Sequence, residues 1–169
     1  WFDEGASESI SAGMGQSYPD SMASSLQAAG NALLEAVTHY GTERPELAVK
    51  VLRSLPLTNP VVAYELGRAA CALGQHQAAI LAFEEARTHA GEDFAVDGRS
   101  VSLFQAAASL WLGDMKAAAQ FLSETTPDAR AKMPHLVAVI AIENGELTMA
   151  EEALGNIDGD DPERPQLEG

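Results

Sequence analysis

The chain has 169 residues, 46% of them hydrophobic and only 6% aromatic, which suits one domain or a short repeat array. Its formal net charge is −15, from 25 acidic and 10 basic residues. Nucleic acids and anionic lipid surfaces are therefore not expected as partners, since binding to their phosphates relies on Lys and Arg. A basic protein partner is compatible with this charge, although acidity alone also keeps a protein soluble.

Three regions follow one another along the chain. Residues 1–18 are rich in Gly and Ser without a sustained hydrophobic period, and they predict a flexible N-terminal arm. Residues 19–157 alternate helical patterns with turn residues, and residues 158–169 predict a disordered acidic C-terminal tail. Abundant alanine and the lack of alternating β-branched runs predict an all-α fold with essentially no sheet.

Four apolar helical runs, each ending near a glycine, organise the central region. In chain order they cover residues 26–40, 61–73, 101–112 and 135–144. A second helical pattern follows each glycine, so we expect four antiparallel helix pairs. Asn59, before Pro60, and Asp114 are expected N-caps, because their side chains can accept hydrogen bonds from the free amides of a first helical turn.

The second halves of these pairs repeat one pattern. LGQHQAAILAFEEA at 73–86 matches LGDMKAAAQFLSET at 112–125 and NGELTMAEEALGNI at 144–157, and a looser copy lies at 40–55. Glycine in second place suits the turn, alanine in seventh place allows a close helix approach, and a large apolar residue in eleventh place fills the gap to the next pair. A wider spacing before the third copy predicts a longer loop near residues 91–98. The alternative is a non-repetitive bundle whose Ala-rich hairpins merely look alike.

The best copy, residues 60–91, resembles the tetratricopeptide repeat (TPR) family, a 34-residue helix–turn–helix. The matching residues are Leu66, Gly67, Gly74, Ala79, Phe83 and Ala86. Ala63, Ala70 and Gly91 depart from the family pattern, and the other copies keep mainly the turn glycine and the second-helix alanine. The resemblance covers residues 26–157 and implies an α-α superhelix (solenoid), in which the first helix of each pair lines a concave groove.

Carried over by register, the resemblance implies a largely apolar groove for a partner. The groove residues would be Tyr64, Arg68, Leu103, Ala107, Trp111, His135, Val139 and Ile142. Tyr64 and Trp111 are candidate anchors and Arg68 is the candidate ion-pairing group, because aromatic residues and Arg often dominate binding energy. Such a groove suits an amphipathic helix or an extended apolar segment. Alternatively, Trp111, Leu103 and Phe104 pack between neighbouring hairpins.

No pattern in the sequence points to catalysis, a cofactor or a metal. A glycine-rich phosphate loop is missing, and the four histidines lie in different units without the spacing of a zinc helix. Cys71, the single cysteine, suits a buried hydrophobe better than a reactive thiol. The leading prediction is a non-enzymatic adaptor or chaperone for a protein or peptide. The alternatives are a structural subunit of a larger assembly, such as a secretion or pilus apparatus, and an all-α enzyme.

Trp1 and Phe2 stand out in the polar N-terminal arm. They are candidates for docking into the groove of this chain or of a partner, or else they mark a cut through a longer protein. No basic-then-apolar stretch resembles a signal peptide, and no run of 18 apolar residues predicts a membrane span. The cytoplasm is therefore favoured, although a chain that starts at Trp1 also fits a fragment or a processed product.

Overall fold

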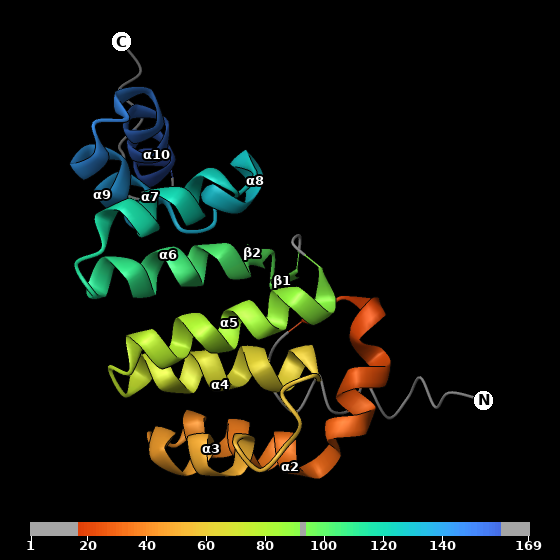
Figure 1. Ribbon diagram of the computed structural model, residues 1–169. Helices are drawn as coiled ribbons and strands as arrows, with labels where there is room; N and C mark the ends of the chain where they lie inside the picture. Colours follow the sequence, from red (N-terminus) through yellow and green to blue (C-terminus); the bar gives the residue numbers. More distant parts are fainter. Residues whose placement is uncertain (1–16, 92–93, 160–169) are drawn as a thin grey trace.

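The computed structural model describes residues 17–91 and 94–159, and this part of the chain is mostly α-helical. Figure 1 shows the helices stacked from the orange end of the chain to the blue end. The elements in chain order are η1 (Asp20–Met22), α2 (Ala23–Gly41), α3 (Pro45–Leu52), α4 (Pro60–Ala72), α5 (His76–Ala90), β1 (Ala95–Val96), β2 (Arg99–Ser100), α6 (Val101–Trp111), α7 (Met115–Ser123), α8 (Pro127–Arg130), α9 (Pro134–Asn144) and α10 (Leu147–Gly159). The all-α prediction is confirmed.

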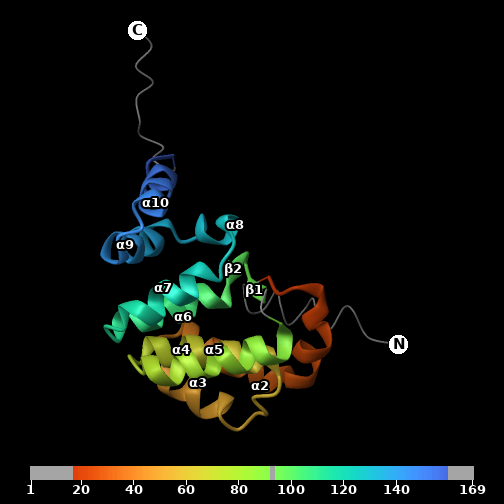
Figure 2. The ribbon, with the colours of Figure 1, turned by 45° about the horizontal axis from the view of Figure 1, so that its top comes forward.

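Helices that follow one another in sequence also pack against one another. The pairs α2–α3, α4–α5, α6–α7 and α9–α10 are each in contact, and neighbouring pairs meet where α3 packs on α4, α5 on α6, and α7 on α9. The view of Figure 2 shows α9 and α10 at one end of this arrangement and α2 with α3 at the other. The predicted four pairs are therefore present, with α8 as an additional single turn between the third and fourth pairs.

The predicted turn and cap residues adopt the expected local geometry. Gly74, Gly113 and Gly145 have φ angles of +69°, +76° and +78°, a left-handed conformation that costs glycine little and other residues more. The Asn59 side chain accepts hydrogen bonds from the amides of Val61 and Val62. The Asp114 side chain accepts one from the amide of Ala117. These side chains supply partners for amides that the first turn of a helix leaves free.

The repeated alanine and large apolar positions form the core between helices. All four alanines are buried, namely Ala48, Ala79, Ala118 and Ala150, and so are Leu52, Phe83 and Leu122 at the large position. Leu154 occupies the same position in the last pair but is 46% exposed. In the described part of the chain no later helix covers it, so the packing surface of the last pair remains open.

Three features differ from the sequence-based expectation. The predicted loop near residues 91–98 contains half of a short antiparallel hairpin, in which Ala95 pairs with Ser100 and Val96 with Arg99. Helix α2 is kinked at Gly30, whose φ is +53°. The predicted flexible N-terminal arm includes residue 18, but Tyr18 is buried in the core. Trp1 and Phe2 lie outside the described residues, as does most of the predicted tail.

The N-terminal core is organised around the ring of Tyr64 on α4. Its centroid lies 5.7 Å from that of Phe104 on α6, 6.0 Å from Phe94 and 6.2 Å from Tyr18. The Phe83 ring on α5 lies 6.1 Å away. Aromatic rings at such edge-on or tilted spacings add stability beyond the apolar area that they bury. This aromatic cluster, Tyr18, Tyr64, Phe83, Phe94 and Phe104, joins two helix pairs, the hairpin segment and the N-terminal segment.

Gly67 is the point of closest approach between α4 and the aromatic cluster. An added Cβ would lie 2.5 to 2.8 Å from three atoms of the Phe83 ring, which is itself held by Tyr64 and Phe104. We predict that Gly67→Ala lowers the free energy of unfolding by about 1–2 kcal/mol, because overpacking outweighs the gain of about 1 kcal/mol in helix propensity.

Urea unfolding followed by circular dichroism measures this change. Gly155→Ala in α10 is the matched control, because nothing lies within 4 Å of the added Cβ. The control should leave stability unchanged or slightly higher. Equal stabilities of the Gly67→Ala variant and the original chain would contradict the close packing.

Candidate interaction surface

Two of the predicted groove residues are core residues. The Tyr64 side chain is 2% exposed, within the aromatic cluster, and Leu103 is fully buried between α6 and the C-terminal helices. Neither presents its side chain to a partner, so their predicted place in an open groove is corrected. For Leu103, the alternative of packing between hairpins holds, and Phe104 packs likewise against Phe83. Helical register identified the correct face of α4, but the N-terminal segment covers that face.

A buried polar triad, Tyr18, Glu65 and Arg68, lies beside the aromatic cluster. The Tyr18 hydroxyl donates a hydrogen bond to the carboxylate of Glu65, which is almost completely buried. Arg68 Nη1 lies 3.3 Å from Glu65 Oε2. Burial, and then the charge of Glu65, raise the pKa of Tyr18 far above its ordinary value, so the phenol remains a proton donor. The triad satisfies a buried carboxylate that would otherwise be costly.

Arg68, the predicted ion-pairing group of the groove, is engaged within the chain. Besides its ion pair with Glu65, its guanidinium lies 4.8 Å from the centroid of the Tyr40 ring, at the end of α2. Its side chain is only partly exposed. A cation over an aromatic ring is attracted by the negative face of that ring. Arg68 therefore helps to hold α2 against α4.

Two hydrogen bonds between Ser17 and Asp97 hold the N-terminal segment at the hairpin. The Ser17 amide donates to Asp97 Oδ1 at 2.6 Å, and the Asp97 amide donates to the Ser17 carbonyl at 3.0 Å. Figures 1 and 2 both show the hairpin beside the beginning of the described chain. Together with the buried Tyr18 ring, these contacts cover the inner face of α4 with the chain's own N-terminal segment.

The last turn of α6 presents an open aromatic surface. Trp111 is 75% exposed, and Ala107, one turn earlier on the same face, is half-buried. The Trp111 ring stacks on the ring of His76 from the start of α5, with centroids 6.2 Å apart and an interplanar angle of 13°. This stack orients a large apolar ring toward solvent. The alternative that Trp111 packs between hairpins does not hold in the described structure.

Helix α9 presents a second open surface. Val139 and Ile142 are 47% and 54% exposed, and His135 is exposed one turn before Val139. On the opposite side, Val137, Ile140 and Ala141 are buried against neighbouring helices. Of the predicted groove residues, the structure therefore leaves Trp111, His135, Val139 and Ile142 accessible, on the first helices of the third and fourth pairs.

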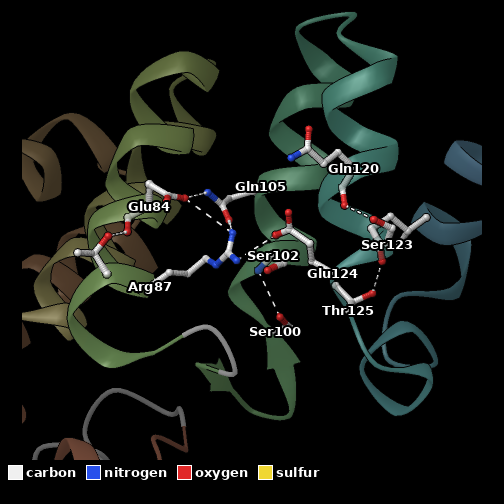
Figure 3. Close-up of polar contacts among 11 residues, drawn as sticks. Glu84, Arg87, Ser100, Ser102, Gln105, Gln120, Ser123, Glu124 and Thr125 are labelled. Carbon is white, nitrogen blue, oxygen red and sulfur yellow. Dashed lines mark hydrogen bonds and ion pairs between the residues drawn. The ribbon is translucent and has the colours of Figure 1, made fainter.

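A polar network, unforeseen from the sequence, joins α5, α6 and α7 (Figure 3). Arg87 Nη1 donates to Gln105 Oε1 at 3.0 Å, and Gln105 Nε2 donates to Glu84 Oε2 at 3.0 Å. Arg87 Nη2 also lies 3.0 Å from Glu124 Oε2. Each charged group faces a partner of opposite charge, which favours a structural link between the second and third helix pairs over acid–base chemistry.

Elsewhere the described residues show little that could support chemistry. Burial raises the pKa of the Cys71 thiol to about 11, so little reactive thiolate forms near neutral pH. Within residues 17–91 and 94–159, no three His, Cys, Asp or Glu side chains converge as a metal site. A hollow of about 480 Å³ between α8, α9 and α10 has Arg130 and Glu152 in its lining, but no nucleophile with an adjacent base. No helix in these two ranges has both the length and the apolar character needed to cross a membrane.

Comparison with known proteins adds no family assignment. No protein-family model, no curated protein and no solved structure matches the chain.

The triad predicts a specific loss of stability. Tyr18→Phe keeps the ring in the aromatic cluster but removes the donor to Glu65. Because hydrogen bonds to charged groups contribute about 1.5–3 kcal/mol, we expect the free energy of unfolding to fall by about that amount. Urea unfolding at pH 7 measures the change.

Tyr40→Phe provides the matched control for Tyr18→Phe. It also removes one phenolic hydroxyl, but it retains the ring on which Arg68 lies. Tyr40 is only partly buried, and the effect of this variant should stay within about 0.5 kcal/mol. Equal losses of unfolding free energy in the two variants would contradict a specific contribution of the Tyr18–Glu65 hydrogen bond to stability.

Proposed function

We propose that the chain is a non-enzymatic interaction module, a TPR-like helical repeat that acts as an adaptor or chaperone for a protein or peptide. The observation that carries this proposal is Trp111, which is 75% exposed and held in place by its stack on His76. Trp is among the residues that contribute most to the binding energy of interfaces.

The chemistry of the accessible surface supports this proposal. Trp111 on α6 and Val139 and Ile142 on α9 are apolar, lie on first helices of their pairs, and suit an amphipathic helix or an extended apolar segment. The TPR-like superhelix is part of the proposal and is supported by the turn glycines and the buried alanines. The net charge of −15 disfavours nucleic acids and anionic membranes as partners.

A second candidate function is a structural subunit of a larger assembly, such as a secretion or pilus apparatus. Leu154 favours this candidate, because its counterparts Phe83 and Leu122 are buried by following helices whereas Leu154 is 46% exposed. Arrays of stacked helix pairs normally end in a pair with a polar outer face. An open apolar end is therefore compatible with stacking against another subunit.

Affinity capture with a Trp111→Ala variant tests the leading proposal. The intact chain is immobilised, exposed to native extract, and compared with the variant by quantitative mass spectrometry. We expect a specific partner to be retained by the intact chain and reduced at least about tenfold with Trp111→Ala, a typical hot-spot loss. Circular dichroism should show unchanged helicity.

Leu81→Ala is the control for this experiment. Leu81 is also largely exposed, but it lies on α5, the second helix of its pair. It should leave partner recovery unchanged. Equal recovery with all three proteins would contradict a binding role for Trp111.

A further inference from the structure

Helix α9 is apolar on two opposite sides but is covered on only one. Val137, Ala138, Ile140 and Ala141 face the core, whereas Val139 and Ile142 are open to solvent. Leu147, directly after the turn, is 70% exposed. A helix with apolar residues all round is normally covered on all sides. We call Val139 and Ile142, together with Leu147 at the start of α10, the α9 face.

The stretch of sequence that carries the α9 face is acidic. Residues 134–159, which form α9, α10 and their turn, contain five carboxylates and neither Lys nor Arg. Glu143 and Glu146 lie between Ile142 and Leu147 in sequence and are exposed. In the described part of the chain, neither carboxylate forms an ion pair. Exposed apolar residues near in sequence to exposed carboxylates without ion pairs are complementary to a surface that is apolar and positively charged.

The chain itself offers no suitable occupant for the α9 face. Residues 1–16 contain three carboxylates and no Lys or Arg, so they match neither the charge nor the pattern required. Residues 160–169 carry four carboxylates, one Arg, and prolines at 162 and 165 that disfavour a helix. In a symmetric dimer through this face, the carboxylates of one copy would face those of the other, which is unfavourable.

We propose that the α9 face is a docking site for a basic amphipathic helix of another protein. Apolar residues of that helix, spaced at i, i+3 or i+4, and i+7, cover Val139, Ile142 and Leu147. Its Lys and Arg residues flank this apolar strip and pair with Glu143 and Glu146. This inference rests on the proposed interaction function and adds the charge and secondary structure of the partner.

The test uses a fluorescent peptide of 18 residues, built from Leu and Lys in an amphipathic helical pattern, and the full chain. Fluorescence anisotropy measures binding at low and high salt. Two control peptides are used. The first has the same Leu and Lys content in scrambled order, and the second has Glu in place of every Lys. We expect the patterned basic peptide to bind at least about tenfold more tightly than either control, and more weakly as salt increases.

Variants of the chain assign this binding to the α9 face. The double variant Val139→Ser/Ile142→Ser should bind the patterned peptide about tenfold more weakly. The double variant Glu143→Gln/Glu146→Gln should also bind it more weakly, and this binding should depend less on salt. Leu81→Ser, at an exposed position on α5, should have no effect. All five positions are exposed, so thermal unfolding should confirm that each variant is folded.

Two results would overturn this inference. One is equal affinity for patterned and scrambled basic peptides, which would show attraction by net charge alone. The other is unchanged binding in both double variants. If Trp111→Ala still abolishes capture of a natural partner, the proposed interaction function remains supported while the α9 face loses its assigned role. If neither Trp111 nor the α9 face affects any binding, the proposed function itself is contradicted.

Discussion

Packing around the Tyr64 ring is the interaction on which the N-terminal half of the structure depends. Tyr64 contributes from α4, Phe83 from α5, Phe104 from α6, Phe94 from the segment before the hairpin, and Tyr18 from the N-terminal segment. Gly67, one turn after Tyr64 on α4, leaves room for the Phe83 ring. The chain has few aromatic residues, and five of them lie together in this cluster. Because alanine side chains bury little area, these rings supply much of the contact between the Ala-rich helix pairs.

This cluster also determines where the chain remains accessible. The inner face of α4 is covered by Tyr18, whose hydroxyl satisfies the buried carboxylate of Glu65. No comparable segment covers Trp111 on α6 or Val139 on α9 within the described residues. The two halves therefore differ: the inner face of α4 is covered by the chain's own N-terminal segment, whereas α6 and α9 present apolar side chains to solvent. The proposed binding function uses only the second half.

Local sequence patterns predicted the helix pairs well because their determinants are local. Glycine at a left-handed turn, Asn59 and Asp114 as caps, and alanine at close helix contacts each act within a few residues. The buried Tyr64 was harder to predict, because helical periodicity identifies an apolar face but does not tell which distant segment covers it. Tyr18 lies 46 residues before Tyr64, and the only sequence signal was a single tyrosine at the end of a polar stretch. Likewise, the repeat pattern assigned Leu154 to the core, but its burial depends on a following helix.

Hydroxyl-radical footprinting with mass spectrometry can distinguish the buried Tyr18 and Tyr64 from the exposed Trp111, because it measures the solvent access of individual side chains in the intact chain. Modification rates of Tyr18, Tyr64 and Trp111 would be compared in the native chain and normalised to the same residues in the urea-unfolded chain. We predict strong protection of both tyrosines and almost none of Trp111. Tyrosines modified as fast as Trp111, or a Trp111 as protected as Tyr64, would contradict a closed N-terminal half and an open C-terminal half.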